Sequence, residues 1–280
     1  MSAVINPHRQ WPQVISDLAE EIRTMDSFRI QGTSSTYVVP QGHASERLVH
    51  APIGIISYAP DELVLVAYAG TPVETIQQEL ATHRQRIRIP TLGSIGGALA
   101  TTRNGYWETS NSTLPNIILG CGVISANGEL FRVGAATVKN VSGFDLVKVM
   151  VGSWGLLGLV AQVTIRCEPI PQSSLWLHAQ GPCNELLVES LYRPSIVARF
   201  EDRTVILLEG HPQDVSDEAK KLPGFVECAP LSDHPTPLLR SRIIVEKSSP
   251  IDQLERRLRA SFDPKNKLNI QLARLLDLLT

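Results

Sequence analysis

The chain alternates short apolar runs with clusters of glycine, proline and small polar residues, and the spacing inside each run predicts its secondary structure. The first run has helical spacing and predicts a helix whose apolar face carries Trp11, Val14, Ile15, Leu18 and Ile22. A predicted strand, Phe28–Gly32, follows and runs into a patch of small hydroxyl residues, Gln31–Thr36. This patch is either a cradle for an anion or a polar surface loop.

Two β-rich runs, Gly54–Ser57 and Glu62–Ala69, precede a helix with clear start signals. We expect Thr71 as the N-cap, Pro72 as the first helical residue and Glu74 as the partner in a capping box. The apolar stripe of this helix should bury Val73, Ile76 and Leu80.

The stretch Pro90–Gly105, PTLGSIGGALATTRNG, follows a short predicted strand at Arg86–Ile89. Its three central glycines allow tight turns and leave backbone N–H groups without side-chain shields. Such groups can hold a phosphate, and the serine and threonine hydroxyls of the stretch would add donors. Glycine clusters are more often plain turns, so this stretch alone is a weak signal.

Further along, Asn116–Ser125 and Glu129–Val133 flank an Asn-Gly turn and predict a β-hairpin. A helix capped by Ser142 should then end at Gly152. Three glycines in GSWGLLG precede a predicted strand, Leu159–Arg166. These glycines indicate a close backbone approach, either to a flat ligand or to a neighbouring helix.

The second half of the chain predicts a β-α-β-β-α-β order, which is typical of a ferredoxin-like unit. Its elements are a strand (Leu175–Ala179), a helix (Glu185–Tyr192), two strands (Ile196–Phe200 and Val205–Glu209), a helix (Val215–Leu222) and a strand (Phe225–Cys228). After a proline-rich linker we expect a strand at Arg242–Val245 and a helix that begins at Ser249 and carries Leu254 on its apolar face. A final leucine-rich helix, Ile270–Leu279, either packs on the first domain or binds a partner.

The composition is that of an ordinary globular protein, with 280 residues, 43% hydrophobic and 19% charged residues and a formal net charge of −2. This charge offers no overall field for nucleic acid. No apolar run approaches the roughly 18 residues of a transmembrane helix, so we expect no membrane-spanning segment. The widely spaced cysteines predict reduced thiols in a cytoplasmic protein. The four cysteines include no C-x-x-C pair and the seven histidines stand singly, which predicts no metal site.

Several of these segments together resemble a known family. The motifs are RIQGTSS, AGTP, SIGGALAT, the hairpin GVISANGELFRVG and the block VKNVSGFDLVKVMVGSWGLLGLVAQVTIRCEP. They are similar to FAD-binding domains of the vanillyl-alcohol oxidase type, and most similar to the FAD-binding subunits of bacterial glycolate oxidases (glycolate dehydrogenases). The likeness covers about residues 10 to 169. Near the C-terminus, RLRASFDPKNKLN resembles the closing turn of the same family, and we therefore expect the chain to be complete.

The resemblance implies an α+β fold, a two-lobed vanillyl-alcohol oxidase type FAD-binding domain with a small ferredoxin-like cap. We expect the FAD-binding domain at residues 1-169, the reduced cap at 170-247 and C-terminal helices that return to the first domain at 248-280. The implied cofactor is FAD, with its pyrophosphate on two small-residue loops and a third segment along the flavin. Matched residue by residue, the implied contacts are Gly32, Thr33, Ser34, Ser35, Ser94, Ile95, Gly96, Gly97, Ala98, Thr101, Gly152, Gly158 and Val160.

The resemblance also implies a function, that of a flavin-binding subunit relaying electrons from the oxidation of a 2-hydroxy acid such as glycolate or lactate. The implied partners are a larger, homologous FAD-dependent subunit and an iron–sulfur subunit, which would also be the route to any membrane association. Relatives that oxidise such acids carry an H-x-G-D-G-N-x-H motif that this sequence lacks, so we expect the substrate chemistry on the larger subunit and assign no catalytic residue.

Two alternative functions stay open. The first loop of the family has consecutive glycines where Thr33 and Ser34 stand here, which favours a non-catalytic scaffold with a decayed flavin site. The other alternative is a stand-alone FAD-dependent oxidoreductase, which the missing substrate motif disfavours.

Overall fold

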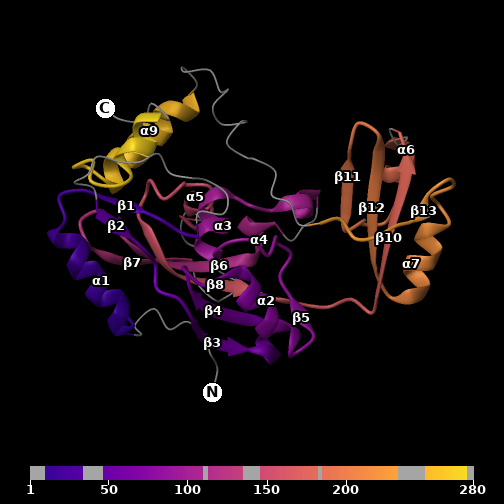
Figure 1. The fold of residues 1–280 in the computed structure, drawn as a ribbon, viewed down its shortest axis with the longest axis horizontal. Coiled ribbons are helices and arrows are strands. Elements are labelled where there is room, and N and C mark those ends of the chain that lie inside the picture. The colour runs from indigo at the N-terminus through magenta and orange to yellow at the C-terminus, as the bar shows by residue number, and fades with distance from the viewer. Residues whose placement is uncertain are drawn as a thin grey trace.

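The central element of the fold is a five-stranded sheet (Figure 1). The computed structural model describes residues 10–33, 47–109, 113–134, 146–181, 185–232 and 250–275. The sheet has the order β3-β4-β8-β6-β7, and each neighbouring pair is antiparallel. The predicted hairpin and the strand after GSWGLLG are confirmed. The strands are β3 (Ile55–Ala59), β4 (Val64–Tyr68), β6 (Ile118–Ile124), β7 (Leu130–Gly134) and β8 (Leu159–Arg166).

Short helices pack their apolar sides against this sheet. Buried side chains from these helices, among them Ile76 and Leu99, form one core with Val123 and Val163 of the sheet. Burying each such side chain stabilises the fold by roughly 1.5–3 kcal/mol. The helices are α2 (Val73–Ala81), α3 (Ile95–Thr101), α4 (Leu114–Ile117) and α5 (Leu146–Met150).

The start of α2 differs from the sequence prediction. The N-cap is Pro72, and no side chain caps it. Thr71 is fully buried, and its Oγ1 both donates to the carbonyl oxygen of Gly54 (3.0 Å) and accepts from the Gly54 amide (2.9 Å). The predicted capping box is therefore wrong, because the threonine hydroxyl ties α2 to the segment before β3 instead of to its own first turn.

A smaller N-terminal lobe lies beside the sheet. It consists of α1 (Gln13–Thr24) and a parallel pair of strands, β1 (Phe28–Ile30) and β2 (Arg47–Val49). The predicted apolar face of α1 buries Ile15 and Ile22, although Val14 is exposed. These side chains share a core with the start of β8, so the lobe and the sheet are packed together.

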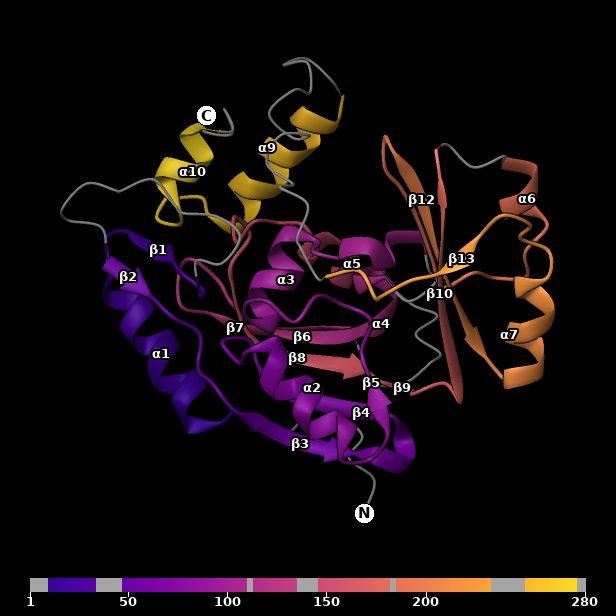
Figure 2. The same ribbon diagram turned by 45° about the vertical axis from the view of Figure 1, so that its right-hand side comes forward.

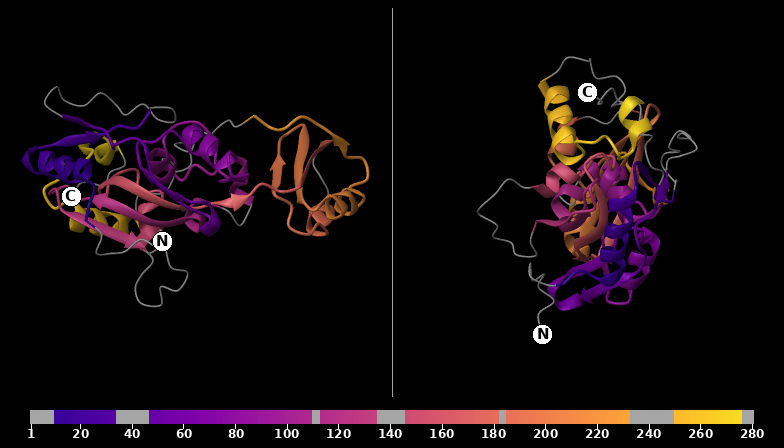
Figure 3. Two further views of the ribbon diagram at one scale, coloured as in Figure 1. Left: turned by 90° about the horizontal axis from the view of Figure 1, so that it is seen from below. Right: turned by 90° about the vertical axis from the view of Figure 1, so that its left-hand side faces the viewer.

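The cap has the predicted β-α-β-β-α-β order and lies at one end of an elongated molecule (Figure 3). Its sheet is antiparallel with the order β11-β12-β10-β13. The exact domain boundaries stay predictions. The elements are β10 (Ser173–Gln180), α6 (Glu185–Glu189), β11 (Ile196–Arg199), β12 (Arg203–Gly210), α7 (Pro212–Ala219) and β13 (Val226–Glu227).

The C-terminal helices, α9 (Pro250–Phe262) and α10 (Ile270–Leu275), lie on the side of β1 and α3 (Figure 2). Phe262 contacts Phe131 with ring centroids 6.0 Å apart. Leu254, predicted on the apolar face of α9, is 55% exposed, whereas Leu272 of α10 is buried. The predicted cap at Ser142, the strand at 242–245 and residues 276–279 of the last helix lie outside the described residues.

Within the described ranges, no helix combines the length and the apolar character that a membrane crossing requires.

An ionic cluster joins the cap to the rest of the molecule. The predicted strand at Arg86–Ile89 is reduced to β5 (Gln85–Arg86), which pairs with β9 (Glu168–Pro169). From β5, the two Nη atoms of Arg86 donate to the carboxylate of Glu209 on β12 at 2.6 and 2.7 Å. Arg86 also donates to Glu168 at 2.9 Å, and Arg88 pairs with the same carboxylate.

We expect low pH, or the substitution Glu209→Gln, to weaken the ionic cluster between the cap and the rest of the molecule. Burial raises the pKa of the Glu209 carboxyl, but the hydrogen bonds and charge of Arg86, a hydrogen bond with Ser195 and the charge of Arg88 outweigh it and hold the pKa below its ordinary value. The stabilisation is therefore present above the unfolded-state pKa of about 4.3 and is lost as the pH falls through the lower folded-state value. Glu209→Gln should lower the free energy of unfolding at neutral pH by about 2–4 kcal/mol, as measured by urea denaturation.

The control for this prediction is Asp217→Asn, which removes the exposed ion pair between Asp217 and Lys220 on α7. Exposed pairs contribute about 0–1 kcal/mol. Equal destabilisation by Glu209→Gln and Asp217→Asn would show that the junction contributes no more than a surface pair.

Candidate functional site

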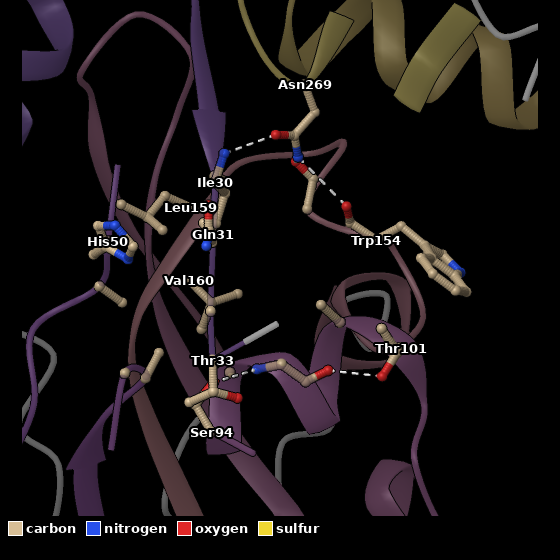
Figure 4. A pocket seen from close by; sticks show the side chains of 18 of the residues that line it. Ile30, Gln31, Thr33, His50, Ser94, Thr101, Trp154, Leu159, Val160 and Asn269 are labelled. Atoms are coloured by element: carbon tan, nitrogen blue, oxygen red, sulfur yellow. Dashed lines mark hydrogen bonds between the residues drawn. The ribbon is translucent and has the colours of Figure 1, made fainter. Parts of the chain in front are cut away.

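A cavity of about 280 Å³ lies where β1, α3, the start of β8 and the C-terminal turn meet (Figure 4). Its wall is made from segments far apart in the sequence. The lining residues are Ile30, Gln31, Gly32, Thr33, His50, Ala51, Ile53, Ala69, Gly70, Ser94, Gly96, Gly97, Ala100, Thr101, Arg103, Trp154, Gly155, Gly158, Leu159, Val160, Asn269 and Leu272.

The two small-residue segments singled out from the sequence meet in this wall. A Cβ added to Gly32 would lie 3.2 Å from Ser94 Oγ, so the first segment lies directly against the start of α3. Thr33 lies beside Ser94 in Figure 4. The cavity thus brings together two stretches that are about 60 residues apart in the chain.

Most of the implied contact residues line this cavity, and a few lie elsewhere. Ile95 and Ala98 are fully buried on the core side of α3. Gly152 lies against α3, where its amide donates to the Leu99 carbonyl. Ser34 and Ser35 lie outside the described residues. The residues that line the cavity are Gly32, Thr33, Ser94, Gly96, Gly97, Thr101, Gly158 and Val160.

The stretch around Ser94 is a helix start rather than an open loop. Ser94 is the N-cap of α3, and its Oγ accepts from the amide of Gly97 at 3.1 Å. The amide of Ile95 donates to the Thr71 carbonyl and that of Gly96 to the Ala69 carbonyl. The sequence predicts open N–H groups here, but these three are already engaged within the protein because α3 begins directly after the turn.

The glycines of α3 have different roles. A Cβ at Gly96 would lie 2.8 Å from both the Cβ and the carbonyl oxygen of Ala69, closer than side-chain carbons approach in real structures. Gly96 therefore allows α3 to pack directly on the end of β4. A Cβ at Gly97 would lie 3.1 Å from Ser94 Oγ and 3.7 Å from Arg103 Nη2, on the cavity side.

Arg103 supplies positive charge to the cavity wall. Its side chain is among the largest fully buried ones, with 2% of the residue exposed. Burial lowers the pKa of the Arg103 guanidinium from its ordinary value, but a guanidinium stays protonated in proteins. Sequence reasoning missed this residue, although a single arginine inside the small-residue run TTRNG was a signal.

The opposite wall carries two of the three glycines of GSWGLLG, Gly155 and Gly158. A Cβ at Gly158 would lie 2.8 Å from Val123 Cγ1 and 2.9 Å from the Ile124 carbonyl oxygen. Close packing against β6 therefore accounts for Gly158, even though this residue also borders the cavity. Trp154 and Gly155 line the cavity as well. The glycine pattern included Gly155, although it was not among the implied contacts, and Trp154 was missed from the sequence.

Among the residues that the structure describes, no group of three or more histidine, cysteine, aspartate or glutamate side chains is arranged to hold a metal ion.

No family model matches the chain. Among curated proteins, it is 32% identical over 212 residues to the glycolate oxidase subunit GlcE of Escherichia coli, which covers 71% of this chain and 60% of GlcE. It is 32% identical over 109 residues to the D-lactate dehydrogenase of Archaeoglobus fulgidus, covering 37% of this chain and 25% of that enzyme. It is 24% identical over 180 residues to the glycolate oxidase subunit GlcD of Bacillus subtilis, covering 59% of this chain and 33% of GlcD.

A solved structure of alkyldihydroxyacetonephosphate synthase matches with a TM-score of 0.60 at 12% identity, covering 82% of this chain and 54% of that chain. This likeness shows the fold. The chain therefore has the vanillyl-alcohol oxidase type of FAD-binding fold. In sequence, the chain is similar to the glycolate oxidase subunit GlcE and spans about 60% of that subunit's length.

We expect Gly96→Ala and Gly97→Ala to affect stability differently. Overpacking against Ala69 should make Gly96→Ala destabilising by about 1–3 kcal/mol. A Cβ at Gly97 would meet only side-chain atoms, the nearest at 3.1 Å, so Gly97→Ala should cost less stability than Gly96→Ala. Urea denaturation of both variants measures the difference, and equal effects would contradict the role given to Gly96.

Proposed function

We propose that the chain binds FAD in this cavity and acts as the flavin-binding subunit of a glycolate oxidase-like complex, relaying electrons from the oxidation of a 2-hydroxy acid. The observation that carries the proposal is the meeting of Gly32 and Thr33 with Ser94 and Gly97 in one cavity, with a buried arginine in its wall. The 32% identity to GlcE supports the same assignment.

The residues present fit a flavin dinucleotide. Gly32 and Gly97 leave room for a diphosphate at the two meeting segments, and the hydroxyls of Thr33 and Ser94 would contact its oxygens. Arg103 would balance its charge, because a guanidinium pairs well with phosphate oxygens. Gly155 and Val160 would border the rest of the cofactor through backbone and apolar contacts. When bound, FAD would supply the two-electron redox chemistry of its isoalloxazine ring.

The proposed complex also contains a larger FAD-dependent subunit and an iron–sulfur subunit in the cytoplasm. Relatives named as glycolate oxidase subunits GlcE and GlcD support an assembly of several subunits. Because this sequence lacks the H-x-G-D-G-N-x-H motif, the hydroxy acid would react on the larger subunit. In this proposal residues 1-169 form the FAD-binding domain, 170-247 the cap and 248-280 the returning helices.

The visible spectrum of the purified and FAD-reconstituted protein tests the proposal. We expect flavin absorption bands that denaturation releases, and we expect Gly97→Val to abolish them because the added side chain would occupy the diphosphate position. Valine costs a helix less than about 1 kcal/mol, so the variant should stay folded, which circular dichroism checks. A wild-type protein that stays colourless would favour the scaffold, and a folded Gly97→Val protein with normal flavin content would contradict the placement.

We expect Arg103→Gln to weaken FAD binding selectively. Losing a charged hydrogen-bond partner costs about 1.5–3 kcal/mol, which corresponds to a roughly tenfold to hundredfold larger Kd. ADP should lose affinity by a similar factor, whereas adenosine, which has no phosphate, should bind Arg103→Gln and wild type alike. Arg103→Lys keeps the charge and should recover part of the affinity. A uniform loss for ADP and adenosine would assign Arg103 a structural role only.

A further inference from the structure

One side chain, that of Asn269, connects the two walls of the cavity. Its Oδ1 accepts from the amide of Ile30 at 2.8 Å, and its Nδ2 donates to the carbonyl oxygen of Gly155 at 2.8 Å. The same Nδ2 lies 3.5 Å from the carbonyl oxygen of Trp154. Figure 4 shows Asn269 between Ile30 and Trp154, above the cavity.

The two walls that Asn269 joins are those implied in cofactor binding. Ile30 is the last residue of β1 and leads directly into Gly32 and Thr33. Gly155 belongs to the glycine segment of the opposite wall. The distance between these walls therefore depends on an amide side chain that uses its acceptor on one wall and its donor on the other.

The C-terminal turn, Asp263–Asn269, holds Asn269 in place. Asp263 accepts from the amides of Lys267 and Leu268 at 2.8 and 2.9 Å. The turn then runs beside β1, where Phe28 donates to the Lys267 carbonyl (2.8 Å) and the Asn269 amide donates to the Phe28 carbonyl (2.9 Å). Asn269 itself is 4% exposed and adopts a left-handed backbone with φ 47°.

The left-handed backbone indicates what selects asparagine here. Asparagine and glycine tolerate this conformation better than other residues. Only asparagine also carries an acceptor and a donor at the end of a short side chain. Asparagine therefore suits position 269, where the backbone is left-handed and the side chain bridges the Ile30 N–H group and the Gly155 carbonyl.

We propose that Asn269 is a positioning residue for the cofactor, so that docking of the C-terminal segment and occupancy of the cavity stabilise each other. This inference rests on the proposed function. Because Leu272 also lines the cavity, the segment after the turn completes the same wall. Coupling between two binding events is reciprocal, so FAD should hold the C-terminal segment in place to the same extent that the segment strengthens FAD binding.

The experiment compares Asn269→Gly with Asn266→Gly in the full-length protein. Asn266 lies in the same turn with φ 50° but does not line the cavity, so glycine relieves the same backbone strain at both positions and removes the bridge at only one. FAD affinity is measured by flavin fluorescence titration, and docking of residues 250–275 by hydrogen exchange with and without FAD.

We expect Asn269→Gly to raise the Kd for FAD about tenfold or more, since each hydrogen bond is worth about 1 kcal/mol and two or three are lost. Asn266→Gly should bind FAD like the wild type. Asn269→Asp, which keeps the acceptor for Ile30 but loses the donor to Gly155, should also bind more weakly. FAD should slow exchange in residues 250–275 of the wild type and of Asn266→Gly, and much less in Asn269→Gly.

Equal FAD affinity and equal FAD-dependent protection in Asn269→Gly and Asn266→Gly would overturn the inference and leave the proposed function intact. A folded Asn269→Gly protein that is less stable but binds FAD normally would likewise overturn it, because Asn269 would then be purely structural. A wild-type protein that binds no FAD would overturn the proposed function and this inference with it.

Discussion

The contact between Gly96 and Ala69 is the constraint on which the site depends. With no side chain between them, α3 lies directly on the end of β4, and the Gly96 amide donates to the Ala69 carbonyl. This placement puts Ser94 and Gly97 in the cavity wall. The same placement engages the first amides of α3 within the protein, so hydroxyls and the Arg103 charge are the polar groups of this part of the cavity wall.

Features set by local pattern could be predicted from the sequence. The helical spacing of Ile15 and Ile22 gave α1, the Asn-Gly turn gave the hairpin, and the order of elements gave the cap. The role of Thr71 could not be predicted this way. The pattern offers its hydroxyl a partner in the first turn of α2, but in the structure the hydroxyl bonds the backbone of Gly54, 17 residues earlier. A capping signature states only what a side chain can do within its own turn.

The candidate site shows the same division. The small-residue segments at Gly32 and Ser94 were visible as patterns, because a bare backbone is a property of the residues themselves. Arg103 was not visible as a pattern, and Asn269 appeared only as the last residue of the motif RLRASFDPKNKLN. An arginine or an asparagine acquires its role from what folds around it. Glycine patterns are ambiguous for a related reason. Gly158 borders the cavity, yet its lack of a side chain is required by β6 behind it.

The hydrogen bonds of the C-terminal turn restrict the distance between the two cavity walls more narrowly than apolar packing would. Apolar contacts, such as those of Trp154 with the cluster that contains Leu272, are non-directional. In contrast, a buried carbonyl such as that of Gly155 loses its partner when the geometry changes, at a cost of about 1–3 kcal/mol. The distance between the walls matters because one wall carries the charge of Arg103. In the proposed function, the attraction between Arg103 and a cofactor phosphate would vary with distance and would be strong only where water is excluded. The hydrogen bonds of Asn269 hold the two walls apart at a fixed distance. That distance would determine how strongly Arg103 attracts a cofactor phosphate.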